Sequence, residues 1–190
     1  MLAARLRRFT SGNAVVVVLS EEAIPGGCQI AAALALPIHF IACHEILCPG
    51  EHEHAIGSVS SRSAVIHATD HSLPQDFIYH QIRIGQTCSR HEEEKWRKVV
   101  PAQTITEKTV VVFSEAIPTV DHILAGIMEI RNQQPARIVV ASPVISRSAF
   151  DELARQVNDV IVLQTEAHPD NKTSQVDHVP HQNRRKIQAI

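Results

Sequence analysis

A short stretch between residues 43 and 54 holds many side chains that can bind a metal ion. Cysteine, histidine and carboxylate are the ligands that zinc and other transition metals take in proteins. Four of these residues could complete one site, although their spacing is irregular: Cys43, Cys48, His52 and His54. The competing interpretation is that Cys43 is a buried strand residue. Metal binding through this stretch is therefore kept as a weaker hypothesis, and no metal site is predicted outright.

No other catalytic signature stands out in the sequence. Serine, histidine and aspartate are present in number, but no G-x-S-x-G nucleophile elbow occurs. The four cysteines form no C-x-x-C pair, which argues against a zinc ribbon or a thioredoxin-type motif. Sparse cysteines without such spacing suit a reducing compartment, so we expect a cytoplasmic protein.

The composition narrows the class of protein. A chain of 190 residues with 44% hydrophobic residues suits one globular core and is short for two domains. A net charge of -2 argues against nucleic-acid binding, and 4% aromatic residues argue against a ligand held by stacking. Apolar runs such as Ala14–Leu19 are too short to span a membrane, and residues 1–10 lack the apolar part of a signal peptide. Neither a nucleic-acid nor a membrane partner is expected.

Short runs rich in valine and isoleucine alternate with helical patterns. Such runs are typical of strands buried on both faces of a parallel sheet. The expected strands are Ala14–Leu19, Ile38–Cys43, Thr109–Phe113, Arg137–Ala141 and Val160–Leu163. Helices are expected over residues 29–36, along the apolar stripe of Val120, Ile123, Leu124, Ile127 and Met128, and along Phe150, Leu153, Ala154 and Val157. This alternation predicts an α/β fold with a parallel sheet.

Two segments interrupt the alternation. Residues 55–60 and 63–68 are expected to form an antiparallel hairpin. Residues 73–100 are expected to be mostly one long polar helix, whose charged end, His91–Lys98, is interpreted as a solvated face. From Glu166 onward the sequence becomes polar and irregular. The predicted organisation is an α/β domain over residues 1–165 and a polar C-terminal extension over 166–190.

Several stretches together carry a family resemblance. Residues 16–31 read V-V-V-L-S-E-E-A-I-P-G-G-C-Q-I-A, and further matches follow at Leu34, Pro37, Ile38, Pro49, Gly50, Glu53, Ala55, Ile56, Gly57 and Val59. Together with the strand–helix alternation from Thr109 to Leu163, these stretches resemble the bacterial family of predicted phosphoribosyltransferases that carries a P-R-G-G loop. The resemblance covers roughly residues 10–165. It implies the Rossmann-like parallel sheet of type I phosphoribosyltransferases with a small antiparallel hairpin insertion, and it implies a homodimer.

The loop that would hold phosphoribosyl pyrophosphate departs from the family pattern. In the family it reads V-D-D-G-x-A-T-G-A-T, where acids face the ribose and backbone amides face the 5-phosphate. The equivalent positions in this chain are Ser114, Glu115, Ala116, Ile117, Pro118, Thr119, Val120, Asp121 and His122. One acid is kept as Glu115, the glycines are lost, and Thr119 alone is retained outright. Thr119 has the competing interpretation of a helix N-cap, and Asp121 that of a residue compensating the helix dipole.

Two further phosphate-facing places are also changed. The pyrophosphate-loop equivalents are Glu21, Glu22 and Ala23, where Glu21 stands at the position of the family arginine. The arginine–lysine pair expected in the loop after the second strand is replaced by His44 and Glu45. A pyrophosphate needs cations and free amides, whereas these positions supply mainly acids. An exposed, functionally silent loop is the competing interpretation for Glu21 and Glu22.

Three functional hypotheses follow. The first is a phosphoribosyltransferase-like protein with degenerate loops that is non-catalytic and acts in binding or regulation. The second is a divergent active phosphoribosyltransferase, acting on a nucleobase or related acceptor, with Glu115 and Thr119 as anchors; whether the chain is an enzyme is thus left open. The third is the metal-binding hypothesis. No cofactor is predicted, and Mg²⁺ is expected only if a phosphoribosyl donor binds. A small-molecule ligand in the cleft is the expected partner, and a protein partner is the alternative.

Overall fold

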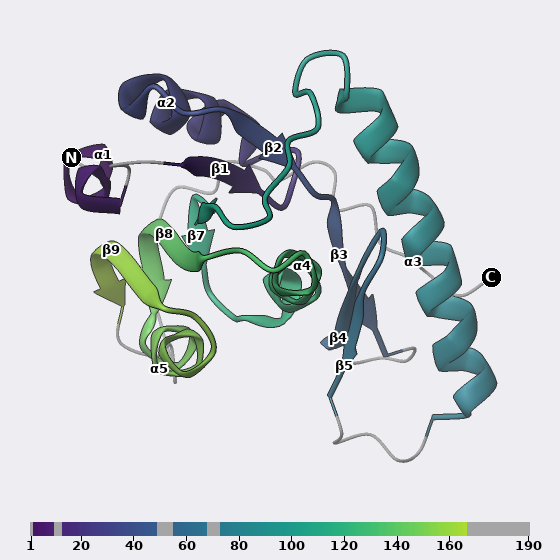
Figure 1. Cartoon of the computed structure of the whole chain (residues 1–190). Coiled ribbons are helices and arrows are strands. Elements are labelled where there is room, and N and C mark those ends of the chain that lie inside the picture. Colours follow the sequence, from purple (N-terminus) through teal and green to yellow (C-terminus); the bar gives the residue numbers. More distant parts are fainter. Residues whose placement is uncertain (1, 10–12, 49–54, 68–72, 167–190) are drawn as a thin grey trace.

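A parallel sheet with helices on both faces forms the body of the protein, and a small antiparallel sheet with a long helix stands beside it (Figure 1). The computed structural model describes residues 2–9, 13–48, 55–67 and 73–166. The predicted C-terminal extension lies outside these residues except for Glu166, which ends the last strand. Within the described ranges, none of the helices is both long and apolar enough to traverse a lipid bilayer.

The parallel sheet follows the order β2-β1-β6-β8-β7, with β9 on the other side of β8. Its strands are β1 (Ala14–Val18), β2 (Ile38–Phe40), β6 (Thr109–Phe113), β7 (Ala116–Ile117), β8 (Arg137–Ser146) and β9 (Asp159–Glu166). Every pairing among them is parallel. Because the strands are parallel, their carboxyl ends meet at one edge, where ligands bind in open α/β sheets.

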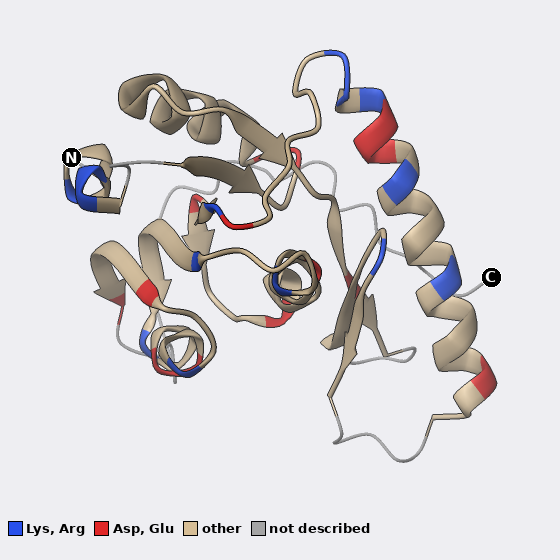
Figure 2. Cartoon of the chain, in the orientation of Figure 1, with Lys and Arg blue, Asp and Glu red and all other residues tan. Residues whose placement is uncertain are grey.

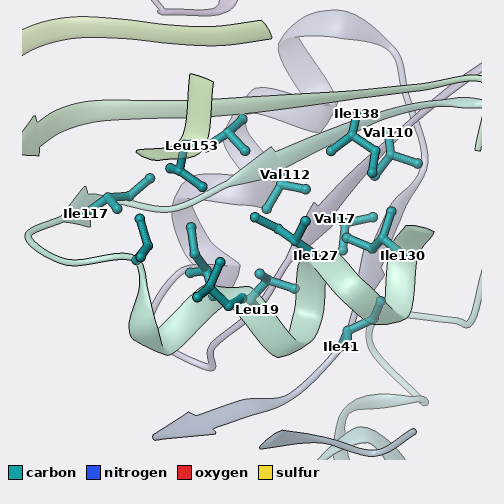
Figure 3. Packing of buried hydrophobic residues seen from close by; sticks show 14 of the residues in the cluster. Val17, Leu19, Ile41, Val110, Val112, Ile117, Ile127, Ile130, Ile138 and Leu153 are labelled. Atoms are coloured by element: carbon teal, nitrogen blue, oxygen red, sulfur yellow. The ribbon is translucent and has the colours of Figure 1, made fainter. Parts of the chain in front are cut away.

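Alternate residues of each strand face opposite layers of helices. Val15 and Val17 pack with α4 (Asp121–Asn132) and α5 (Arg147–Gln156), as the close view of this cluster shows (Figure 3). Val16 and Val18 pack with α1 (Leu2–Leu6) and α2 (Ile24–Leu34). A short 3-10 helix, Arg7–Phe9, follows α1. Burial on both faces explains why these strands are nearly all valine and isoleucine.

The antiparallel sheet has the order β3-β4-β5, formed by β3 (Cys43–Leu47), β4 (Ala55–Ser60) and β5 (Ala64–Ile66). The helix α3 (Gln75–Trp96) covers its outer face, and α4 packs against its inner face (Figure 1). The hairpin predicted at residues 55–68 is confirmed as β4 and β5. The third strand, β3, is not predicted by the sequence.

Several predicted boundaries and exposures are wrong. The strand predicted at Ile38–Cys43 ends at Phe40, and Cys43 begins β3 of the other sheet. The helix predicted at residues 29–36 begins at Ile24. Pro25 is tolerated in its first turn, because the backbone N–H that proline lacks would have no helical partner there. Met128, predicted to lie in the apolar stripe, is 37% exposed. The α/β class and the antiparallel insertion are confirmed.

Candidate functional site

Three segments meet at the carboxyl edge of the parallel sheet. They follow β1 (residues 19–23), β2 (residues 41–42) and β6 (residues 114–120). The backbone ties the first two together, since the N–H of Cys43 donates to the carbonyl of Leu19 over 3.0 Å. The third segment lies against the first turn of α2, which follows the first segment, since a Cβ on Gly26 would be 3.1 Å from Oε1 of Glu115. The segments after β1 and β6, which the sequence singles out, therefore lie at the same edge of the sheet.

Glu21 is held by the end of α3. Its Oε1 accepts a 2.8 Å hydrogen bond from Nε1 of Trp96 and lies 3.0 Å from Nζ of Lys95. The Glu21 side chain is about one-third exposed, at 32%. Glu21 therefore fastens the β1–α2 segment to α3. Glu21 is only partly exposed, whereas Glu22 is exposed as the competing interpretation expects, and the functional silence of this loop stays a prediction.

Lys95 and Trp96 are site residues that the sequence does not predict. They lie in the charged run His91–Lys98, which the sequence assigns to a solvated face. That interpretation is wrong for Glu92, which is 9% exposed, and for Trp96, which packs against the α1–α2 core. The sequence does contain a signal for the buried face of α3. Its buried residues recur at helical spacing, at Gln81, Gly85, Ser89 and Glu92.

The segment after β6 is ordered by its own backbone. The hydroxyl of Ser114 donates to the carbonyl of Ala116 over 3.0 Å, and Ala116 and Ile117 pair with β8 as strand β7. This pairing turns backbone groups of the segment toward β8, whereas a phosphate-binding loop needs them free. Thr119 is not the N-cap of α4: that position is Val120, and no side chain caps the helix.

The acid retained in this segment, Glu115, is exposed and lies over the first turn of α2. The positive end of the helix dipole favours a carboxylate at this position. The same position would otherwise favour an anionic ligand. Asp121, in the first turn of α4 as expected, is 2.7 Å from Nε2 of His67 on the segment that follows β5. Both carboxylates add negative charge at the edge where a pyrophosphate would need cations.

His44 and Glu45 do not lie in a loop after the second strand, which corrects their predicted place. Both are in β3, where His44 pairs with Val59 and Glu45 with Ser58. Nε2 of His44 lies 3.4 Å from Oε2 of Glu92 on α3. His44 is thus directed to the interface between the small sheet and α3 and supplies no free cation to the cleft.

The metal hypothesis gains no support from the described residues. Among them, no three histidine, cysteine, aspartate or glutamate side chains come close enough to hold an ion. Burial raises the pKa of the Cys43 thiol to about 12, which opposes the thiolate form that a metal requires. Cys48 follows β3, while His52 and His54 lie outside the described residues.

Comparison with known proteins concerns the fold. No protein-family model matches the chain. The chain is similar to the crystal structure of TT1426 from Thermus thermophilus, with 22% identity, a TM-score of 0.72, and coverage of 91% of this chain and 82% of that one. A hypoxanthine phosphoribosyltransferase from Staphylococcus aureus has 10% identity, coverage of 87% and 69%, and a TM-score of 0.49. A hypothetical protein from Neisseria gonorrhoeae with bound ppGpp has 13% identity, coverage of 87% and 75%, and a TM-score of 0.49.

The architecture is the α/β fold with a parallel sheet and a small antiparallel insertion that the sequence predicts. Its parallel sheet is covered by helices on both faces, and the small antiparallel sheet is inserted after β2. At the identities found, the likeness to solved structures shows the fold alone, so function has to be argued from the residues at the carboxyl edge.

Proposed function

We propose that this chain is a phosphoribosyltransferase-like protein with degenerate substrate loops, acting in binding or regulation rather than in phosphoribosyl transfer. The observation that carries the proposal is the contact of Glu21 with Lys95 and Trp96. The family resemblance puts an arginine at this position to meet pyrophosphate. An acid that is already engaged by α3 supplies neither the positive charge nor the freedom to reach a ligand.

The rest of the edge supports the same conclusion. Glu115 lies over the first turn of α2, and Ala116 and Ile117 have their backbone paired with β8. A phosphate entering here would be repelled by the negative charges of the exposed Glu22 and Glu115 side chains. The cleft therefore suits a ligand that is neutral or cationic, or a protein partner, better than a polyphosphate.

The proposal includes two properties that follow from the resemblance and the cysteines. We expect a homodimer, which size-exclusion chromatography with light scattering measures directly. We also place the protein in the cytoplasm, since all four cysteines are free thiols and two of them, Cys28 and Cys88, are exposed. No cofactor is part of the proposal, and Mg²⁺ would enter only with a phosphoribosyl donor.

An assay of pyrophosphate release tests the catalytic half of the proposal. The full chain is incubated with phosphoribosyl pyrophosphate, Mg²⁺ and, in turn, adenine, guanine, hypoxanthine and uracil. Release at the rate of the protein-free control is expected with every base. Release that needs both base and Mg²⁺, and that Glu115→Ala abolishes, would establish the active transferase instead. Glu94→Ala, an exposed acid on α3, is the matched control and should change nothing.

A further inference from the structure

A polar cavity borders the segment after β2, since Ile41 lines it, but none of its lining residues comes from the segments after β1 and β6. Its volume is about 110 Å³, and its walls come from β2, the turn between β4 and β5, the end of α3, the connection to β6, and α4. Glu129 on α4 lies eight residues beyond Asp121, which is about 12 Å along the helix axis. The cavity is therefore distinct from the cleft described above, although α3 and α4 border both.

Two carboxylates are held in place on the inner walls. Oε1 of Glu93 accepts a hydrogen bond from the N–H of Ala42 over 3.2 Å. Oε2 of Glu129 accepts one from the N–H of Arg62 over 3.0 Å, and both of its oxygens lie 3.4 Å from Oγ of Ser61. Glu129 is only 4% exposed. Backbone and hydroxyl donors thus orient both carboxylates before any ligand arrives.

The charges of the two carboxylates affect one another. Burial raises the pKa of Glu93, and the charge of Glu129 raises it further. Two acids that repel each other in a half-buried place are stabilised when a cationic group comes between them. The inner end of the cavity therefore favours a ligand that carries an ammonium group.

Two arginines line the outer part of the same cavity. Arg62, at the turn between β4 and β5, and Arg97, at the end of α3, are both exposed. Figure 2 shows that basic residues occur along α3 and on the hairpin beside it. Burial and the charges of these two arginines lower the pKa of His39 to about 4, so His39 is neutral at pH 7. The N–H of Gln103 donates to Nδ1 of His39 over 3.2 Å, which leaves the proton on Nε2.

The charge of Arg62 acts on Glu93 and lowers the pKa of that carboxyl, against the larger effect of burial, but the two side chains are not in contact as an ion pair. Among the residues that the structure describes, no ion pair joins Arg62 or Arg97 to Glu93 or Glu129. The cavity is therefore lined by two carboxylates that are buried or half-buried and by two exposed arginines that form no ion pair with them. A ligand with a positive and a negative end would meet opposite charge at both ends, whereas a simple cation or anion would meet one of its own sign.

We propose that this cavity binds a small α-amino acid, with its ammonium group toward Glu93 and Glu129 and its carboxylate toward Arg62 and Arg97. The volume has room for about four water molecules, or for a ligand of about five or six bonded non-hydrogen atoms. Glycine and alanine are of that size, and serine exceeds it by one atom. A guanidinium group is suited to a carboxylate because it donates two parallel hydrogen bonds.

Calorimetric titration of the full chain tests the proposal, with glycine, L-alanine and L-serine as probes. Saturable binding of at least one amino acid is expected, with no saturable binding of methylammonium or acetate at the same concentrations. Arg62→Gln and Arg97→Gln are each expected to weaken binding about tenfold or more, because each removes one partner of the ligand carboxylate. Arg90→Gln, an exposed arginine earlier on α3, is the matched control and should leave the affinity unchanged.

Two results would overturn this proposal. One is the absence of heat with all three amino acids from protein whose circular dichroism and unfolding are normal. The other is acetate binding as tightly as alanine, which would indicate a plain anion site. None of the residues that carry the proposal belongs to the β1–α2 or β6–α4 segment. The outcome is therefore independent of the outcome of the transferase assay.

Discussion

Nε1 of Trp96 donates a 2.8 Å hydrogen bond to Oε1 of Glu21, across 75 positions of the sequence. The bond joins the end of α3 to the segment between β1 and α2. Lys95 adds an ion pair to the same oxygen at 3.0 Å. An acid at this position is therefore part of the structure that orders the cleft, and a cation placed there would disturb the fold as well as change the charge.

Removing the indole donor should weaken the fold measurably. Trp96→Phe keeps an aromatic ring but not the N–H, and hydrogen bonds to charged groups contribute about 1.5–3 kcal/mol, less where water reaches them. We expect the free energy of unfolding to fall by about 1–2 kcal/mol in urea denaturation. A double-mutant cycle with Glu21→Gln should give a coupling above about 0.5 kcal/mol, since the two side chains touch. Strictly additive losses would contradict the contact, and exposed Lys98→Gln is the control.

Two glycines should differ sharply in their tolerance of a methyl group. A Cβ on Gly57 would lie 2.2 Å from the backbone oxygen of Val65, so the strands β4 and β5 would have to move apart. Gly57→Ala should cost about 2–3 kcal/mol of unfolding free energy or more. A Cβ on Gly126 would lie 2.7 Å from Cδ2 of Leu19, which is the end of a side chain that can shift. The gain of about 1 kcal/mol in helix propensity offsets part of that strain, so Gly126→Ala should cost less. Equal losses in the two variants would argue against the β4–β5 register.

His39 should make stability depend on pH below neutrality. Its pKa is lowered from 6.5 to about 4, chiefly by burial and then by Arg62 and Arg97. Between these values the unfolded chain takes up a proton that the folded chain does not, so stability is lost as the pH falls from 6.5 toward 4. The raised pKa of Glu93 acts in the opposite direction. Comparison with a His39 variant separates the two effects.

In His39→Asn the side-chain oxygen can still accept the N–H of Gln103, but no proton is taken up. Lowering the pH from about 6.5 to about 4.5 should reduce the free energy of unfolding of both proteins. We expect the reduction to be about 2 kcal/mol smaller in this variant than in the parent chain. Urea unfolding at a series of pH values measures the difference. Parallel stability curves for the two proteins would show that His39 titrates normally.

The exposed and the buried cysteines should react at very different rates. Burial raises the pKa of Cys43 to about 12, whereas Cys28 and Cys88 are exposed. Because the thiolate is the reactive form, iodoacetamide should label Cys28 and Cys88 in the native protein and Cys43 only after unfolding. Peptide mass spectrometry gives the site of each label. Native labelling of Cys43 at the rate of Cys88 would place its thiol in a more open or more polar environment.

The sequence predicts five of the six strands of the parallel sheet, because each of these is a short run rich in β-branched residues. It does not predict β7, which is only Ala116–Ile117. It predicts the wrong end for the strand at Ile38, since the apolar run continues through Ile41 and Ala42 while the chain leaves one sheet for the other. It also assigns the charged end of α3 to solvent. Nothing local in that run shows that Trp96 and Lys95 meet a residue 75 and 74 positions earlier.

The candidate site is predicted only in part by the sequence. The substitutions at Glu21, Glu22 and Glu115 are visible from the family resemblance alone, and the structure brings their segments to one edge. The fixing of Glu21 by α3 and the pairing of Ala116 and Ile117 with β8 depend on contacts between distant segments. For the same reason, the cavity lined by Glu93, Glu129, Arg62 and Arg97 has no local signature in the sequence.

Binding of phosphoribosyl pyrophosphate in the presence of Mg²⁺, followed by isothermal titration calorimetry on the full chain, tests the central claim most directly. The account predicts no saturable heat up to about 1 mM ligand, since the cleft presents carboxylates where phosphate needs cations. Saturable binding in the micromolar range that is lost in Glu115→Ala, and kept in Glu94→Ala, would contradict it and establish a donor site built on the retained acid.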